Sequence, residues 1–315
     1  MPISTKGETT MYYCGWDGGG STTKTLAVDE QGNVLAESVF GPLNPNGASR
    51  EKVEETVRDA VRWMDSLPGG LNGCMGLAAG MAGVSNLEAA QFVENAVRSS
   101  GYAGLFRLVG DQVIALEGAI QGHGAILIAG TGAVCYGRDT VGNIFRTGGY
   151  GYLIDDGGSG YALGRDILAA VVRAFDGRGP KTCLTALVYD FLYLPDISSL
   201  ITWLYAPGTG KKEIGSLAPL LLKALEQNDE AAVAIADKAV NDLADLVTVS
   251  WRKTGMTDGE LALYGSIFQY YSFIREHLTR RLREALPGVS VIAARYSAAH
   301  GAALLAMKLF KGAQS

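Results

Sequence analysis

A pattern of strands and turns recurs along this chain at a fixed spacing of 110 residues. The segment DEQGN at 29–33 corresponds to DTVGN at 139–143. The glycine-rich turns that precede these segments keep the same register, because Gly20 lies 110 residues before Gly130. A single match of this kind could arise by chance, since Gly and Asn are common in turns. Two matches in one register indicate an internal duplication, so the sequence predicts two similar units.

Each unit is expected to begin with a three-stranded antiparallel meander and to continue with helices and strands in alternation. In the first unit, short apolar runs separated by turn residues predict the meander, and apolar residues at helical spacing follow from Val53 to Met64. Strands that alternate with helices indicate a mostly parallel sheet. The strands are expected at 11–16, 25–28, 34–39, 73–80 and 105–110, and the helices at 50–64, 87–99 and 111–122.

The second unit repeats the meander and is richer in helix. No Pro/Ser linker separates it from the first unit, so the boundary near 116 rests on the repeat alone. Its strands are expected at two places within 125–137, on either side of a glycine turn, and at 144–147, 260–268 (running into a Gly-Ser turn) and 289–294, and its helices at 160–175, 229–253, 268–286 and 297–310.

The composition excludes several classes of partner. The 315 residues carry a net charge of −5, so no basic field exists to hold nucleic acid, and an acidic chain is poorly suited to an anionic membrane surface. The first ten residues are polar and lack an apolar signal core, and no apolar run approaches membrane-spanning length. We expect a cytoplasmic protein with a flexible leading segment and with no nucleic-acid or membrane partner.

The cysteines and histidines show no metal-binding pattern. No two cysteines are neighbours in the sequence, no CxxC pair exists, and three of the four lie in apolar, strand-like runs. We expect reduced core cysteines, as in a cytosolic protein. The histidines are scattered without ligand spacing. These residues are Cys14, Cys74, Cys135 and Cys183, and His123, His277 and His300.

The segment DGGGSTTK at 17–24 joins two expected strands and is suited to binding phosphate. Three glycines allow a tight turn whose backbone amides point at an anion, the following hydroxyls add donors, and Lys24 could add charge. The GxxxxGK[ST] spacing of a Walker loop is absent, and no helix follows. The alternative is a glycine-rich hairpin without a ligand. The second turn, GTG at 130–132, favours two loops that clamp a polyphosphate, with Asp17 holding Mg²⁺, usually through water.

Asp111 follows an apolar strand and opens an expected helix. One interpretation is a helix N-cap, for which Asp is a favoured residue. The other is a general base at the carboxyl end of a strand, where ligands bind in open α/β sheets. Phosphoryl transfer uses such a carboxylate to orient and deprotonate the attacking hydroxyl. The two interpretations are compatible.

Three further segments are weaker candidates for binding. In 146–166, glycines give backbone access, Tyr150 offers a stacking face and two adjacent aspartates offer acceptors for sugar hydroxyls. A flexible acidic loop would have the same composition. Asn44 in GPLNPNG could bind hydroxyls or merely make an Asx turn. The Gly-Ser turn of YGSIF (264–268) could let an adenine pass close to the backbone, although most such turns bind nothing.

Taken in order, these motifs resemble the sugar kinase branch of the actin–Hsp70–hexokinase superfamily. The resemblance is greatest to N-acetylglucosamine kinases, within the BadF/BadG/BcrA/BcrD ATPase family, and covers nearly all of residues 12–310. The motifs that carry it are DGGGSTTK, GPLN, VGD, IAGTG, TGGYGYLIDDGGSGYALG and YGSIF.

The resemblance implies an α/β fold of two duplicated ribonuclease-H-like (actin-like ATPase) lobes. Each lobe would be a mixed five-stranded sheet with flanking helices, and the lobes would enclose a cleft. The final helix would pack back on the first lobe, as it does in the family. The small lobe would therefore comprise 11–116 together with about 297–315, and the large lobe 117–296.

The resemblance also implies an activity: phosphorylation of an amino sugar by ATP with Mg²⁺, most directly of N-acetylglucosamine to its 6-phosphate. Asp111 matches the family's catalytic base, and domain closure on the sugar would exclude water. Homodimers are common in the family. The implied contacts are Asp17 with Mg²⁺; Gly18, Gly19, Gly20, Ser21, Thr22, Thr23, Gly130, Thr131 and Gly132 with the phosphates; Gly265 and Ser266 with adenosine; and Asn44, Asp111, Thr131, Gly149, Tyr150 and Asp156 with the sugar.

The chain departs from the family beside the sugar contacts. The family loop usually reads GDEGS, whereas here Asp155 replaces its Gly and Gly157 replaces its Glu, and Tyr150 stands where the family has Trp. Glucosamine, N-acetylmuramic acid or another hexose are therefore alternative substrates. Two other classes remain: an ATPase that activates a radical dehydratase through an iron–sulfur cluster, disfavoured by the lack of a cysteine cluster, and a non-catalytic sugar or nucleotide sensor.

Overall fold

The computed structural model describes residues 10–120 and 122–311. The leading segment that we expect to be flexible falls outside these residues, except for its last member, Thr10. Residue contacts divide the chain into two compact units, Met1–Gln121 with Ala294–Ser315, and Gly122–Ala293. The boundary expected near 116 falls within helix α4 (Asp111–Ala119), which belongs wholly to the first unit.

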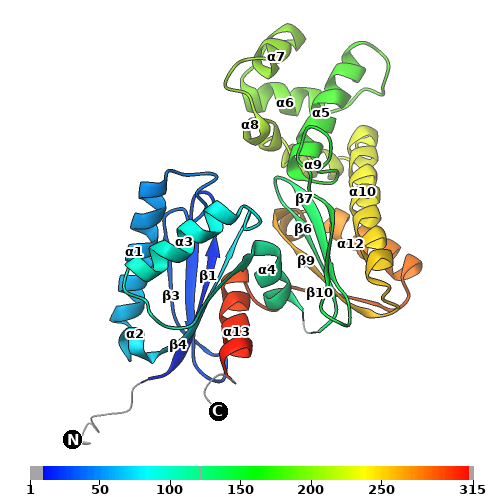
Figure 1. The fold of residues 1–315 in the computed structure, drawn as a ribbon. Helices are drawn as coiled ribbons and strands as arrows, with labels where there is room; N and C mark the ends of the chain where they lie inside the picture. The colour runs from blue at the N-terminus through cyan, green and yellow to red at the C-terminus, as the bar shows by residue number, and fades with distance from the viewer. Residues whose placement is uncertain (1–9, 121, 312–315) are drawn as a thin grey trace, which may run out of the picture. The chain divides into compact units, whose positions relative to one another are not determined.

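Each unit contains a mixed five-stranded sheet of the same topology (Figure 1). The strand order is β3-β2-β1-β4-β5 in the first unit and β8-β7-β6-β9-β10 in the second, with the first three strands antiparallel and the last two parallel to their neighbours. The predicted duplicated α/β fold is therefore confirmed. The strands are β1 (Tyr12–Gly18), β2 (Thr23–Val28), β3 (Val34–Phe40), β4 (Cys74–Met81), β5 (Phe106–Gly110), β6 (Gly124–Ala129), β7 (Ala133–Arg138), β8 (Ile144–Gly148), β9 (Gly259–Tyr264) and β10 (Val289–Ala293).

The two DxxGN turns that revealed the repeat have the same hydrogen bonds. In each turn the aspartate Oδ1 accepts a hydrogen bond from the asparagine backbone N–H, at 2.8 Å in both, and Oδ2 accepts one from the asparagine side-chain amide, at 2.9 Å in both. Gly32 and Gly142 both adopt the left-handed conformation, with φ of 89° and 93°. The turns therefore conserve their backbone path because each aspartate side chain closes its own turn.

Helices cover both faces of the first sheet (Figure 1). One face packs on α1 and α3, and the opposite face packs on α13, which lies beside α4. The approach of α13 is close at Gly15, where a Cβ atom would lie 2.2 Å from the Ala299 carbonyl oxygen. Any larger side chain at this position would push the helix away from β1. These helices are α1 (Arg50–Ser66), α2 (Gly70–Gly73), α3 (Leu87–Ser99), α4 and α13 (Ala298–Phe310).

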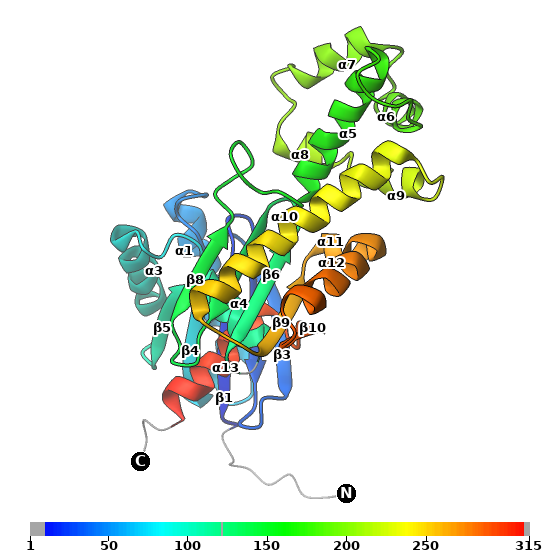
Figure 2. The same cartoon turned by 90° about the vertical axis from the view of Figure 1, so that its right-hand side faces the viewer.

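The second unit has a larger helical part (Figure 2). The long helix α10 packs on β6, β7 and β8 and contacts both α5 and α12. The core is correspondingly larger and extends from the sheet to the short helices α6 and α9. The helices are α5 (Gly160–Phe175), α6 (Leu184–Leu192), α7 (Ile197–Leu204), α8 (Lys211–Gly215), α9 (Leu220–Leu225), α10 (Glu230–Thr254), α11 (Ser266–Tyr270) and α12 (Ser272–Ala285).

The prediction of one continuous helix at 268–286 is wrong, because the helix is interrupted at Tyr271. Residue Tyr271 leaves the helical conformation, with φ −108° and ψ 79°, and separates α11 from α12. Apolar residues on both sides of the break, including Phe268 and Ile274, are buried. The periodicity therefore continues across the break and could not reveal it.

The cysteines, the potential metal ligands and the apolar helices were also considered in the sequence. All four cysteines are free, and three of them are buried while Cys183 is half-buried. Within the described residues no His, Cys, Asp and Glu side chains form a group of three that could hold a metal ion. Across 10–120 and 122–311 no single helix has the length and apolar character to cross a membrane; the bent pair α6 and α7 passes that test by length and composition only.

His300 in α13 gives the first unit a pH-dependent stability. Burial lowers the pKa of this imidazole, although its Nε2–H donates to the Gly32 carbonyl oxygen at 3.1 Å, which opposes the shift. Because the pKa is lower in the folded state, the unfolded chain binds the proton more tightly, and stability falls as the pH drops below about 6.5. We expect His300→Gln to flatten the dependence of the unfolding free energy on pH between about 7 and 5, measured by urea denaturation. An unchanged slope would contradict this assignment.

Candidate active site

The first glycine turn exposes only its central residues. The Gly19 N–H donates to the Thr22 carbonyl oxygen at 2.9 Å, which closes the turn, and Gly20, Ser21 and Thr22 are exposed. Thr23 is fully buried, and its hydroxyl donates to the Gly41 carbonyl oxygen at 2.8 Å. The exposed amides and hydroxyls that we expect to meet phosphate therefore lie at 20–22, while the Thr23 hydroxyl is engaged within the fold.

Two carboxylates lie close together beside this turn. Asp17 is in β1, and Asp111 begins α4 directly after β5. Burial raises the pKa of Asp17, the Lys24 ammonium opposes that shift, and the negative charge of Asp111 adds to it. The first unit thus holds two acidic groups near each other, and the charge of Asp111 disfavours ionisation of Asp17.

The N-cap interpretation of Asp111 is wrong. The N-cap residue is Gly110, and Asp111 is the first residue of α4. Its Oδ1 accepts a hydrogen bond from the neighbouring Gln112 N–H at 3.0 Å, and α4 has no side-chain cap. The carboxylate still lies in the first turn of α4.

Asn44 makes the Asx turn that the sequence offered as one interpretation. Its Oδ1 accepts a hydrogen bond from the Asn46 N–H at 2.9 Å, and its side-chain amide donates to the Ala82 carbonyl oxygen at 3.1 Å. The backbone N–H of Asn44 donates to the Gly19 carbonyl oxygen at 3.3 Å, which ties this loop to the first glycine turn. A sugar contact by Asn44 stays a prediction.

The second glycine turn meets the Gly-Ser turn within the second unit. The Gly130 carbonyl oxygen accepts a hydrogen bond from the Gly160 N–H at 2.7 Å, at the start of α5. Gly265 has φ of 109°, and a Cβ atom there would lie 2.3 Å from the Ala129 carbonyl oxygen. Glycine is thus required at position 265 for two reasons, the left-handed conformation and the close approach of β6. The predicted phosphate and adenosine segments of this unit are therefore neighbours.

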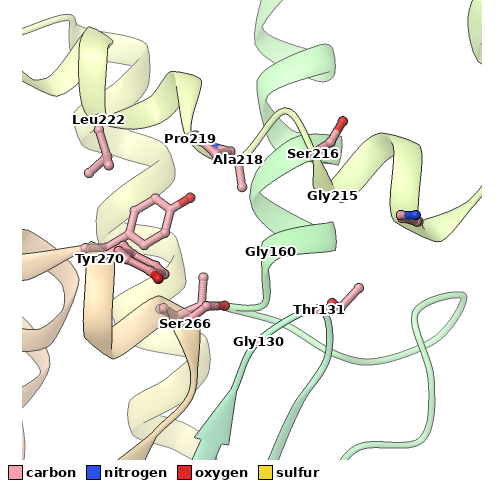
Figure 3. A pocket seen from close by; sticks show the side chains of 13 residues that line it. Gly130, Thr131, Gly160, Gly215, Ser216, Ala218, Pro219, Leu222, Ser266 and Tyr270 are labelled. Atoms are coloured by element: carbon pink, nitrogen blue, oxygen red, sulfur yellow. The ribbon is translucent and has the colours of Figure 1, made fainter. Parts of the chain in front are cut away.

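A pocket of about 570 Å³ opens beside these two turns (Figure 3). Figure 3 shows Gly130, Thr131 and Ser266 on one side of it and the 215–219 segment on the other. Its size is that of a small-molecule site, and its lining is mostly apolar with a few polar groups, as nucleoside sites are. The lining residues are Gly130, Thr131, Gly160, Lys212, Gly215, Ser216, Ala218, Pro219, Leu222, Ser266, Ile267, Tyr270 and Tyr271.

The sequence predicted only part of this lining. It singled out the glycine turn and Ser266, but not the wall formed by residues 212–222 or the tyrosine at 270. That wall is formed by α8, by the loop after it and by the start of α9. The helix α8 has five residues and α9 has six. Such helices are shorter than the window over which hydrophobic periodicity can be recognised.

The loop between β8 and α5, residues 149–159, is shaped by glycines and by one aspartate. Gly149 and Gly151 are left-handed, with φ of 76° and 102°. The Tyr150 N–H donates to Asp155 Oδ2 at 3.0 Å, so Asp155 closes the loop. The Tyr150 ring is 65% exposed, with the Arg146 guanidinium 4.6 Å from its centroid. Asp155 therefore helps to place the exposed Tyr150 ring, and a sugar contact by Tyr150 stays a prediction.

Asp156 is buried, and both of its carboxylate oxygens have partners. Oδ1 accepts a hydrogen bond from the Ala133 N–H at 3.4 Å, next to the second glycine turn. Oδ2 forms an ion pair with the Lys211 ammonium at 2.9 Å. Asp156 also has a left-handed backbone, with φ of 63°, which is costly for a residue other than glycine. The fold thus holds this carboxylate in a fixed position, and a sugar contact by it stays a prediction.

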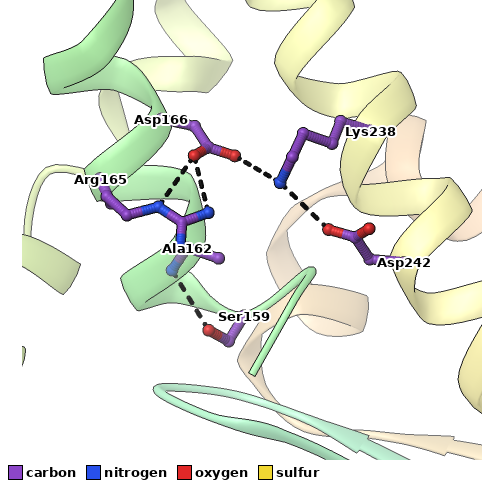
Figure 4. Close-up of polar contacts among 6 residues, drawn as sticks. All are labelled: Ser159, Ala162, Arg165, Asp166, Lys238 and Asp242. Carbon is purple, nitrogen blue, oxygen red and sulfur yellow. Dashed lines mark hydrogen bonds and ion pairs between the residues drawn. The ribbon is translucent and has the colours of Figure 1, made fainter. Parts of the chain in front are cut away.

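The glycine at 157 has a physical reason. A Cβ atom at Gly157 would lie 2.8 Å from Asp242 Oδ2. Asp242 in turn faces the Lys238 ammonium at 3.2 Å, and Lys238 also pairs with Asp166 of α5 at 2.9 Å (Figure 4). A Glu at 157, as in the resembled family loop, would bring a third carboxylate to this network. Asp242 of α10 therefore explains why glycine, rather than the Glu of GDEGS, stands at position 157.

Comparisons with known proteins agree with the fold. An N-acetylmuramic acid/N-acetylglucosamine kinase of Clostridium acetobutylicum is 33% identical over 94% of this chain and 98% of its own. An N-acetyl-D-glucosamine kinase of Dictyostelium discoideum is 29% identical over 94% and 97%. A crystal structure from Chromobacterium violaceum, of a proposed N-acetylglucosamine kinase, superposes with a TM-score of 0.70 and 26% identity over 95% and 99%.

The duplicated five-stranded sheets, with a glycine turn after the first strand of each, place the chain in the actin-like ATPase fold class. Within that class the family is also established. The model of the BadF/BadG/BcrA/BcrD ATPase family matches residues 14–306, and the chain belongs to this family.

Proposed function

We propose that this protein is an ATP-dependent amino sugar kinase. The observation that carries the proposal is the nucleoside-sized pocket of the second unit, which lies against the second glycine turn in a chain of an ATPase family. Relatives that match almost the whole chain are named as kinases of N-acetylglucosamine or N-acetylmuramic acid, which supports this class of substrate. The pocket would hold adenosine, and the two glycine turns would bind the phosphates.

For the substrate we propose N-acetylglucosamine, phosphorylated at its 6-hydroxyl. Glucosamine and N-acetylmuramic acid are the alternatives, because the loop of Tyr150, Asp155 and Gly157 departs from the pattern of the resembled kinases. The sugar would contact Asn44, Gly149, Tyr150 and Asp156, as the resemblance implies. We further propose a cytoplasmic location, a sugar as the partner rather than nucleic acid or membrane, and a homodimer.

In the proposed reaction Asp111 is the general base. Its carboxylate accepts the proton of the 6-hydroxyl while that oxygen attacks the γ-phosphorus of ATP. The bond between the γ-phosphorus and the β,γ-bridging oxygen breaks, and the products are the sugar 6-phosphate and ADP. The glycine-turn amides hold the phosphates throughout, because a preorganised set of donors stabilises the developing charge.

The acidic pair also fits a magnesium ion. Burial raises the pKa of Asp17 and the negative charge of Asp111 adds to that shift, and a divalent cation would relieve the repulsion between the two carboxylates. Magnesium commonly takes only one or two protein carboxylates and completes its shell with water and phosphate oxygens. A bound Mg²⁺ would neutralise charge on the β- and γ-phosphates, with Asp17 as its protein anchor.

The proposed function is tested by ADP release from Mg-ATP across N-acetylglucosamine, glucosamine, N-acetylmuramic acid, N-acetylmannosamine and glucose. Strong stimulation by one amino sugar would establish the kinase and identify its substrate. If no sugar stimulates release, the dehydratase activator and the sensor become the better proposals. Iron content after anaerobic purification separates those two, although three of the four cysteines are buried and so are poorly placed to share a cluster.

The adenosine pocket is tested by filling it. Ser266 is exposed at the start of α11 and lines the pocket opposite 215–219. We expect Ser266→Phe to weaken ATP binding at least about 10-fold with little change in sugar affinity, because the ring would occupy the space that the nucleoside needs. Isothermal titration with ATP and with the sugar measures both. Ser272→Phe, at an exposed position that begins α12 outside the lining, is the matched control. Equal effects of the two substitutions would remove adenosine from this pocket.

A further inference from the structure

The ion pair between Asp156 and Lys211 joins segments that lie 55 residues apart in the chain. The carboxylate side is 4% exposed and the lysine side chain 32% exposed, so the pair is largely withdrawn from solvent. Removing the lysine charge would leave the buried Asp156 carboxylate without its ion-pair partner. Loss of this ion pair is therefore expected to disturb the structure more than loss of an exposed surface pair.

Each end of the pair belongs to a different part of the proposed site. Asp156 lies in the loop of residues 149–159, and its other oxygen faces Ala133 beside the second glycine turn. Lys211 is the first residue of α8, and Lys212 and Gly215 of the same helix line the nucleoside-sized pocket. One side chain thus connects the proposed sugar loop to the wall of the proposed adenosine pocket.

The surroundings of Lys211 make this connection stiff. The Lys211 ammonium also lies 5.6 Å from the centroid of the Tyr152 ring, and that ring packs edge-on against Tyr161 of α5 at 4.9 Å. The helix α8 is pressed against α5, because a Cβ atom at Gly164 would lie 2.0 Å from the Ile214 carbonyl oxygen. A shift of α8 would therefore act on the loop through Lys211.

We infer that Lys211 is a positioning residue that couples nucleotide binding to the conformation of the 149–159 loop, and through it to sugar binding. This inference rests on the proposed function for the identity of the two ligands. Nucleotide in the pocket would fix α8, α8 would fix Lys211, and Lys211 would hold Asp156 and Tyr152 in the arrangement that receives the sugar. Lys211 itself touches neither ligand in this account.

The first test measures the coupling between the two ligands. The dissociation constant of the sugar that stimulates ADP release is determined with and without saturating Mg-AMPPNP, a non-hydrolysable ATP analogue. We expect the analogue to tighten sugar binding at least about 5-fold in the wild type and less than about 2-fold in Lys211→Met. Lys211→Arg retains the charge and is expected to restore part of the coupling. Lys223→Met, at an exposed lysine of α9, is the matched control and should behave as the wild type.

A second test needs no sugar and so separates this inference from the proposed function. Hydrogen exchange of the 149–159 backbone amides is followed with and without Mg-AMPPNP. We expect the analogue to slow this exchange in the wild type and in Lys223→Met but not in Lys211→Met. If Lys211→Met fails to fold, the double variant Asp156→Asn/Lys211→Met, which leaves no unpaired charge, takes its place.

The outcomes are decisive in either direction. Loop protection that persists in Lys211→Met, or a wild type whose loop does not respond to the analogue, overturns the inference. Loss of protection in Lys211→Met in a protein that phosphorylates no sugar would uphold the coupling and reject the kinase. A uniform loss of affinity for both ligands, with the coupling factor unchanged, would show a merely structural role for the ion pair.

Discussion

Asp111→Asn is expected to reduce phosphoryl transfer at least about 100-fold while the protein folds and binds ATP as before. Asparagine has the same shape as aspartate, and its amide oxygen can still accept the hydrogen bond from the Gln112 N–H. It cannot accept the proton of the attacking hydroxyl. The lost rate would then be attributable to proton acceptance and orientation rather than to damage of α4.

The comparison requires kcat for the sugar kinase reaction and the dissociation constant of ATP for each protein. Asp59→Asn is a suitable control, since Asp59 lies on α1, is about half exposed and makes a long i,i+3 contact with Arg62. Turnover near the wild-type level in Asp111→Asn would assign the base to another group. A loss of ATP affinity as large as the loss of turnover would instead indicate that Asp111 serves binding.

The duplication could be predicted because each turn is determined by its own residues. Asp29 and Asp139 bond to backbone and side-chain groups within four positions, so the motif specifies the turn without help from the rest of the fold. The same holds for the long helices, whose apolar stripes repeat over several turns. Local signals of this kind survive in a single sequence.

The candidate site could be predicted only in part, because contacts between distant segments decide it. The hydroxyl of Thr23 reads as a phosphate donor until Gly41 is seen to accept from it. Lys211 carries no signal at all, since its importance lies in a partner 55 residues away. Asp111 reads equally well as a cap or a base, and a shift of the helix start by one residue removes the first interpretation.

Asp17→Asn is expected to abolish most of the activity, by at least about 100-fold, and yet to stabilise the fold at neutral pH. The loss of activity follows if Asp17 anchors Mg²⁺, because an amide is a weaker ligand than a carboxylate for a hard cation. The gain in stability follows from the raised pKa of Asp17, which is caused by burial, is opposed by Lys24 and is increased by the charge of Asp111. An acid with a raised pKa binds its proton more tightly in the folded state than in the unfolded chain, so its ionisation destabilises the fold.

The sign of that effect fixes the pH at which to measure it. The penalty develops as the pH rises from the ordinary aspartate pKa, near 4, through the raised value, and is complete at neutral pH. Urea denaturation in the presence of a chelator should therefore show Asp17→Asn to be more stable than the wild type at pH 7–8, with the difference vanishing near pH 4.

Asp29→Asn is the opposing control, because a hydrogen bond from Asn33 lowers the pKa of Asp29 and its charge favours the fold. If Asp17→Asn is instead less stable than the wild type at neutral pH, the carboxylate makes a contact that stabilises the fold by more than burial and repulsion destabilise it. The proposal that Asp17 lowers stability in return for metal binding would then be rejected.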